Sequence, residues 1–287
     1  MVDILAFLVV LFALVVATYT DIKKREVPDW LSFALIAAGF GIAAIKSITD
    51  LNFLPIISSG VGFAVAFAIS LLMFYTGQWG GGDAKILMGI GATIGASLSF
   101  SDFFPAFLFN TIIIGAAYGL LWGISLGLIN RRKLVLEMKK LFLLPKVIRL
   151  RFASAIISLV LAAAIFFLPL RGIRLSLLLL VFIIFSTLYL WIYVKAVEKT
   201  CMMKKVKPKE LTEGDWIVED IIVNKKFIAG KKDLGVSKEQ IQKLTALFKK
   251  GKIKDIAIKT GIPFVPSFLI SYITTFFAGN LFLLVIR

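Results

Sequence analysis

The chain has 287 residues, of which 59% are hydrophobic, and its mean hydropathy is +0.94. An apolar content this far above that of soluble domains indicates a protein that uses the lipid bilayer as its solvent. The sequence has no histidine and one cysteine, Cys201, which excludes Ser-His and Cys-His catalysis, an intrachain disulfide and the commonest zinc ligand.

Stretches of about 17–25 mostly apolar residues are long enough to cross the hydrocarbon core as helices. Eight candidates follow one another along the chain, at residues 4–20, 30–45, 54–75, 84–99, 103–129, 152–170, 175–194 and 264–286. The second and fourth are short, so the sequence predicts an all-α polytopic membrane protein with six to eight transmembrane helices. A cleaved signal peptide would carry Lys or Arg before its apolar stretch, and none precedes the first stretch here. We therefore expect this stretch to remain in the protein as a helix.

The charged residues are distributed unevenly between these stretches. If the N-terminus lies outside, 29 of the 33 Lys and Arg residues fall on the inner side, which fixes the orientation by the positive-inside rule. The net charge of +16 would suggest nucleic acid in a soluble protein. Here topology and attraction to anionic lipid head groups explain it, so we expect a multi-pass protein of the cell membrane and no nucleic-acid partner.

Two segments between the apolar stretches are polar. Residues 131–151 mix basic residues with leucines and predict an amphipathic helix at the membrane interface. Residues 195–261 are polar enough to fold as a small cytoplasmic α+β domain before the last helix. Its pattern predicts strands at Trp216–Val223, Phe227–Ile228 and Ile253–Lys259, a turn at Lys225–Lys226, and a helix at Ser237–Lys250 that begins in a capping box.

These segments predict five regions. They are a transmembrane core at 1–130, the basic interfacial segment at 131–151, a helical hairpin at 152–194, the cytoplasmic domain at 195–261 and a C-terminal transmembrane helix at 262–287. The core contains the acidic residues with the most distinctive surroundings.

Two of these acidic residues stand at the inner ends of the first two helices. Asp21 ends the first helix, where the negative end of the helix dipole disfavours a carboxylate by up to about 1 kcal/mol. An ion pair with one of the basic residues at 23–25 is the simplest reason for its place. Asp29 follows Pro28 and is predicted to cap the N-terminus of the second helix.

A third, Asp83, follows three consecutive glycines, Gly80, Gly81 and Gly82, and opens the fourth helix. Capping alone would stabilise a carboxylate there, but capping does not need three glycines. Residues without a Cβ permit irregular φ and ψ angles and the close approach of a second backbone, such as a substrate strand. A phosphate-binding loop is the alternative, although its spacing and its Lys-Ser/Thr pair are missing.

Asp21 and Asp83 are predicted to lie on the same, inner side of the membrane, near the surface where water can reach them. Two neighbouring carboxylates hydrolyse peptides without histidine, cysteine or metal, because an ionised aspartate can take a proton from water while a protonated one donates to the carbonyl. The two aspartates are therefore candidates for a catalytic pair that needs no metal and no cofactor. Chemistry alone leaves other assignments open.

Two motifs resemble those of the type IV prepilin peptidases and archaeal preflagellin peptidases, which are GxGD aspartyl proteases. Asp21, followed by Arg25-Glu26-Val27-Pro28-Asp29, is similar to the first-aspartate loop of that family. Gly80-Gly81-Gly82-Asp83-Ala84-Lys85 is similar to its GxGDxK motif. The resemblance implies that Asp21 and Asp83 are catalytic and that the glycines shape the site.

The resemblance also implies a reaction. It is the removal of the short basic leader from pilin-like or flagellin precursors, the expected partners, at the cytoplasmic face. Bifunctional relatives carry a domain with paired cysteines and also N-methylate the product. With one cysteine and a short connection between its first two helices, this chain is expected to lack methyltransferase activity. The eight candidate spans exceed the six of compact members, and residues 152–194 are a candidate addition.

Two alternatives differ in their sequence requirements. A presenilin-like or signal-peptide-peptidase-like protease would need Tyr-Asp in the first motif and Pro-Ala-Leu near the last span, and neither Tyr19-Thr20-Asp21 nor Pro263-Phe264-Val265-Pro266 fits. A transporter or a scaffold would place acidic residues near mid-membrane at broken helices, where these spans carry almost none.

Overall fold

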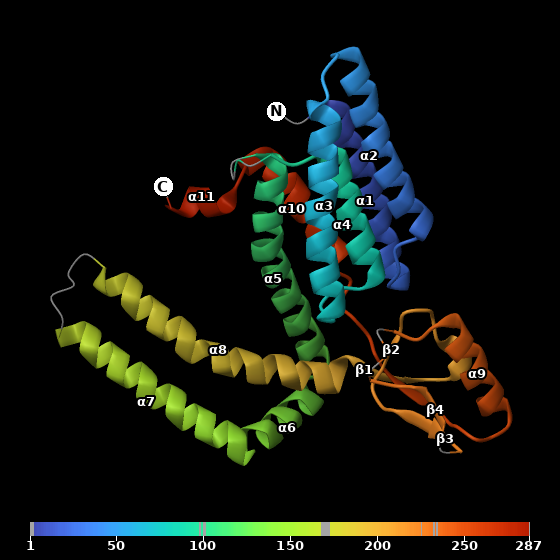
Figure 1. Ribbon diagram of the computed structural model, residues 1–287. Coiled ribbons are helices and arrows are strands. Elements are labelled where there is room, and N and C mark those ends of the chain that lie inside the picture. Colours follow the sequence, from blue (N-terminus) through green and yellow to red (C-terminus); the bar gives the residue numbers. More distant parts are fainter. Residues whose placement is uncertain are drawn as a thin grey trace. The chain divides into compact units, whose positions relative to one another are not determined.

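The computed structural model describes residues 3–97, 99, 102–167, 173–224, 226–231, 233 and 235–286. Helices dominate, and the described strands lie between Met203 and Lys259, before the last helices (Figure 1). The predicted class, a polytopic helical membrane protein with a small α+β region, is confirmed. The chain divides into two compact units, and each is described by itself.

The first unit comprises Met1–Leu121, Lys207–Asp255 and Gly261–Arg287. Its apolar helices are α1 (Ile4–Lys24), α2 (Asp29–Thr49), α3 (Leu54–Tyr75), α4 (Gly81–Ile94), most of α5 (Phe103–Ile129), α10 (Val265–Ala278) and α11 (Leu281–Ile286). Helices α1, α2, α3 and α5 are long and apolar enough to cross a membrane, as are α7 and α8 of the second unit. Six such helices among the described residues fall at the lower end of the predicted range.

Helix α4 lies at the centre of the first bundle and packs against α1, α2 and α3 (Figure 1). It has 14 residues, about 21 Å, which is shorter than the hydrocarbon core. The predicted span at 84–99 is therefore wrong at both ends. The helix begins earlier, at Gly81, and stops before Gly95, which has a φ of +73°. Residue 98 lies outside the described residues.

Small residues bring α3 and α4 together. A Cβ on Gly62 would lie 2.2 Å from the Gly91 carbonyl oxygen, so the two backbones touch. The Ser59 hydroxyl donates to the Ala92 carbonyl at 2.6 Å, and the Ser70 hydroxyl donates to the Ala84 carbonyl at 2.9 Å. These buried hydrogen bonds fix the position of α4 along α3, since an unpaired hydroxyl would be costly there.

The predicted last helix at 264–286 is interrupted, and its single-helix assignment is wrong. It breaks between α10 and α11, where Gly279 has a φ of +67°. The Asn110 amide of α5 donates to the Gly279 carbonyl at 2.7 Å, and its carbonyl oxygen accepts the Leu281 N–H at 3.0 Å. One buried amide thus replaces the helical bonds lost at the break, as broken membrane helices require.

The polar part of the first unit contains a short helix, strands and α9. They are η1 (Pro208–Glu210), β2 (Trp216–Ile217), β3 (Ile221–Val223), β4 (Lys226–Ala229) and α9 (Lys238–Lys249). Strands β3 and β4 form an antiparallel pair. Ser237 and Gln240 make both bonds of the predicted capping box at the start of α9.

One strand prediction in this part is wrong. The continuous strand expected at Trp216–Val223 is interrupted between β2 and β3. Before β3 the Asp220 carboxylate accepts the Lys231 N–H at 2.9 Å, so the chain bends to close another loop instead of extending the strand. The predicted turn at Lys225–Lys226 includes residue 225, which lies outside the described residues.

The second unit comprises Trp122–Val206 and Ile256–Thr260. It contains the end of α5, then α6 (Arg131–Phe142), α7 (Pro145–Phe167), α8 (Arg174–Cys201), β1 (Met203–Val206) and β5 (Ile256–Lys259). Strands β1 and β5 pair antiparallel. Leu134 and Leu141 of α6 are buried in a cluster with residues of α8.

The amphipathic segment predicted at 131–151 is two elements. Helix α6 ends at Phe142, and α7 starts at Pro145, because proline suits the first position of a helix and cannot continue the preceding one. Residues 168–170 of the predicted span at 152–170 lie outside the described residues. The strand expected at Ile253–Lys259 is the shorter β5.

Candidate active site

Asp21 is buried near the end of α1, with 6% of its surface exposed. Its carboxylate accepts the Val265 N–H at 3.0 Å, at the first residue of α10. Arg25, one of the three basic residues considered as an ion-pair partner, is near enough to act electrostatically on the Asp21 charge. The hydrogen bond, however, comes from a helix N-terminus. A helix N-terminus stabilises a carboxylate, and this offsets the unfavourable position at the end of α1.

The chain turns sharply after Asp21. Arg25 has a φ of 60° and donates its backbone N–H to the Asp21 carbonyl at 2.8 Å, which ends α1. Its guanidinium donates to the Gly261 carbonyl at 2.8 Å. The first aspartate loop is thereby tied to the segment that leads into α10.

Asp29 does not cap α2 as predicted. The capping position is Pro28, Asp29 is the first helical residue, and no side chain makes a capping bond there. The Asp29 carboxylate instead accepts a bond from the Lys85 ammonium of α4 at 2.6 Å. Asp29 therefore binds a side chain of another helix instead of the backbone N–H groups of its own helix. The sequence around Asp29 does not reveal this partner.

Asp83 stands in the first turn of α4, outside the six helices long enough to span a membrane. Its carboxylate accepts the Gly80 N–H at 3.0 Å. A Cβ on Gly82 would lie 3.0 Å from the Val27 Cβ, whereas Cβ atoms on Gly80 and Gly81 would have ordinary room. The irregular backbone expected at the glycines is absent, since none of the three has a positive φ.

The fold brings the two motifs together. Helices α1 and α4 pack against each other, Val27 lies on Gly82, and Lys85 binds Asp29. Burial of the Asp83 carboxyl, together with the nearby Asp21 charge, raises the pKa of Asp83 to about 7, while the Gly80 N–H opposes the rise. The protonated form of Asp83 is therefore favoured much more at neutral pH than in an exposed aspartate.

Aromatic side chains pack together around the start of α10, whose Val265 N–H binds the Asp21 carboxylate. The Trp79 ring centroid is 5.5 Å from that of Phe264 and 5.2 Å from that of Phe268. Phe264 fits against α5 because Gly115 has no Cβ there. The sequence motifs do not reveal these residues or the Val265 N–H as part of the site. The Pro263–Pro266 run before the last helix was the available signal.

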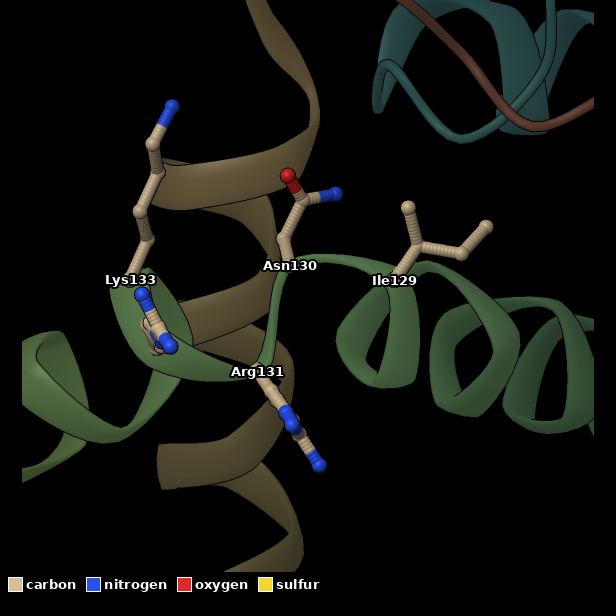
Figure 2. A pocket seen from close by; sticks show the side chains of 5 residues that line it. Ile129, Asn130, Arg131 and Lys133 are labelled. Carbon is tan, nitrogen blue, oxygen red and sulfur yellow. The ribbon is translucent and has the colours of Figure 1, made fainter.

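A second candidate location is a hollow of about 290 Å³ at the turn between α5 and α6, lined by residues 129–133. Three of its five residues are basic, which suggests an anion site. Figure 2 shows Lys133 and Asn130 pointing to one side of the turn and Arg131 pointing to the other. Because Arg131 and Lys133 point to opposite sides, these two cations do not converge on a single ligand. Among the described residues, no group of three His, Cys, Asp or Glu side chains could hold a metal.

Known proteins resemble the part of the chain that carries both motifs. Residues 8–120 match the type IV leader peptidase family. The preflagellin peptidase of Methanococcus voltae is 42% identical over 90 residues, 31% of this chain and 38% of the relative. That of Methanocaldococcus jannaschii is 36% identical over 88 residues, 31% of this chain and 37% of the relative. The similarity thus spans little more than a third of these relatives.

A more distant relative is similar over its whole length. The prepilin peptidase EppA of Methanothermobacter thermautotrophicus is 20% identical in an alignment that takes in the whole chain and 97% of the relative. The regions beyond residue 120 therefore also have a counterpart, although at low identity.

Proposed function

We propose that this chain, whose residues 8–120 match the type IV leader peptidase family, removes the short basic leader from pilin-like or archaeal flagellin precursors with Asp21 and Asp83 as the catalytic pair. The observation that carries this proposal is the electrostatic interaction between two aspartates far apart in the sequence. Helices α1 and α4 pack against each other, and burial of the Asp83 carboxyl, together with the charge of Asp21, raises the pKa of Asp83.

The two carboxylates differ in their surroundings, and this assigns their roles. Asp21 accepts a backbone N–H at the N-terminus of α10, which stabilises its ionised form. Asp83 has a pKa of about 7 and carries the shared proton. Asp21 then takes a proton from the attacking water while Asp83 protonates the substrate carbonyl oxygen. When the tetrahedral intermediate collapses, Asp21 gives its proton to the leaving amine and Asp83 takes one back from a hydroxyl of the intermediate, which restores the starting pair.

The surroundings of the pair also suit a peptide substrate. Gly80 and Gly81 have space beside them where a Cβ would stand, so an extended strand can approach the backbone next to Asp83. This supports a binding role for the glycine run, in which Gly82 serves the packing of one motif on the other.

The proposed place of the reaction is the cytoplasmic face of the cell membrane. With the N-terminus outside, both aspartates and most basic residues fall on the inner side, where anionic lipid head groups attract the basic residues. We propose peptidase activity without methyltransferase activity, no cofactor and no nucleic-acid partner.

The direct test is to incubate the purified full-length protein with pilin-like and flagellin precursors and to locate the cut by mass spectrometry. The proposal predicts one cut just before the hydrophobic helix of the precursor. Cuts within that helix would favour a presenilin-like protease instead, and intact precursors of both kinds would contradict the proposal.

A further inference from the structure

The loop between α3 and Gly80 leads directly into the second aspartate motif, and two aromatic contacts hold it. On one side Trp79 lies against Phe264 and Phe268. On the other, a Cβ on Gly77 would lie 2.5 Å from Cη2 and 2.8 Å from Cζ3 of Trp216. The edge of the Trp216 indole thus rests on the Gly77 backbone.

Gly77 sets the direction in which the chain leaves α3. It has a φ of +69°, and its N–H donates to the Phe74 carbonyl at 3.0 Å. The N–H groups of Gln78 and Trp79 both donate to the Met73 carbonyl, at 2.9 and 3.2 Å. Such a left-handed glycine ends a helix in a defined turn. A side chain at this position would be disfavoured both by φ and by the Trp216 ring.

Trp216 is presented by a well-anchored turn of the polar segment 207–255. Gly214 donates its N–H to the Val236 carbonyl at 2.9 Å, and Val236 donates its own N–H to the Asp215 carbonyl at 2.9 Å. Val236 and Ile217 are buried. The indole therefore projects from fixed backbone, and it can hold a neighbour in place.

We propose that Trp216 is a positioning residue of the reaction. Through Gly77 it fixes residues 76–80, and the Gly80 N–H, which binds the Asp83 carboxylate at 3.0 Å, carries that constraint to Asp83. The polar segment 207–255 then serves the active site by holding the loop that leads into it. This inference rests on the proposed peptidase function.

A different role for the indole makes a different prediction. Tryptophan side chains often lie in the head-group region and anchor a protein to the membrane surface. Removal of such an anchor would weaken the contact of segment 207–255 with the bilayer and leave residues 77–80 unchanged. The state of this loop therefore separates the two roles.

The kinetic test compares full-length variants in lipid nanodiscs with a precursor as substrate. Trp216→Ala should lower kcat about tenfold and leave KM within about twofold, because a small displacement of a catalytic group slows the reaction. Trp216→Phe should recover part of the rate, and the alkaline limb of the pH profile should move in Trp216→Ala. Phe227→Ala, which removes an exposed aromatic ring from β4 of the same segment, should retain wild-type kinetics.

Hydrogen exchange read by mass spectrometry tests the loop without using activity. In Trp216→Ala the amides of residues 77–80 should exchange faster, while those of α9 keep their protection and show that the segment is folded. If α9 loses protection in Trp216→Ala, this variant is not properly folded, and the exchange of residues 77–80 is then measured in Trp216→Phe instead. Wild-type exchange at residues 77–80, or faster exchange with wild-type kcat, would overturn the inference.

The two proposals fail separately. A wild-type protein that cuts no precursor contradicts the proposed function, and the exchange measurement still decides whether Trp216 fixes the loop. A Trp216→Ala variant that cuts at the wild-type rate contradicts only the positioning role.

Discussion

The helices around the aspartates and the helices α7 and α8 are similar in composition and differ in how much they bury. In α1, 33% of the 18-residue apolar stretch is buried inside the protein, against 11% of the corresponding stretch in α7 and 6% in α8. Around α4 the contacts are made by glycines and by hydroxyls that bind carbonyls. Apolarity places a helix in the membrane, whereas small and polar residues determine which helices it contacts.

The largest loss of stability should come from adding a methyl group where the backbones of α3 and α4 touch. A Cβ in Gly91→Ala would lie 2.4 Å from the Gly62 carbonyl oxygen, and overpacking of backbone against backbone should cost about 3 kcal/mol. The matched control is Gly60→Ala in α3, where a Cβ meets nothing within 4 Å. Unfolding in mixed micelles of rising SDS content measures both. Equal midpoints for the two variants would mean that the close contact between Gly62 and Gly91 contributes nothing specific to the stability of the core.

The next effect should come from the buried amide at the break between α10 and α11. Asn110→Leu leaves the Gly279 carbonyl and the Leu281 N–H without the partner that they have now. Unpaired buried backbone groups should lower the free energy of unfolding by about 2 kcal/mol. The same micelle assay checks this, with Ile156→Ala on the exposed surface of α7 as the comparison. A smaller loss for Asn110→Leu than for Ile156→Ala would show that the break needs no amide.

The pH dependence of cleavage tests whether the core holds a titrating acid. The pKa of Asp83 is raised to about 7, so the proton that it donates is lost above this pH, and kcat/KM should fall about tenfold per pH unit. For stability the sign is the same. A raised carboxyl pKa contributes stability at low pH that is lost as the pH rises through about 7. A flat rate from pH 6 to 9, with the helical circular dichroism unchanged, would remove the proton donor from the scheme.

The smallest effect should come from the ion pair between the two motifs. Lys85 and Asp29 are partly exposed, with 34% and 63% of their side chains accessible, and such pairs contribute about 0.5 kcal/mol. A double-mutant cycle of Asp29→Asn and Lys85→Gln should give a coupling of this size in the unfolding assay. A coupling above about 2 kcal/mol would make the pair a main support of the site.

The sequence predicts the apolar helices well because their length and composition are local properties. The ends of α4 and α10 depend on the φ angles of Gly95 and Gly279. A glycine adopts either sign of φ according to its tertiary surroundings. The predicted helices were therefore too long at these places.

The candidate site likewise has one part that the sequence reveals and another that only the structure shows. Both motifs are readable as short strings of residues, and the match of residues 8–120 to the type IV leader peptidase family agrees with the resemblance. The partner of Asp21 is a backbone N–H that lies 244 residues further along the chain, and the partner of Asp29 is a lysine on another helix. Neither is a property of the neighbouring sequence, so both had to come from the structure.

The central claim is that Asp21 and Asp83 act as a catalytic pair, and cleavage of a pilin-like or flagellin precursor by single variants tests it most directly. Asp21→Asn and Asp83→Asn should each abolish the cut, while Asp29→Asn, which changes a nearby carboxylate outside the pair, should retain substantial activity. Cleavage at the wild-type rate by Asp21→Asn or by Asp83→Asn would contradict the claim.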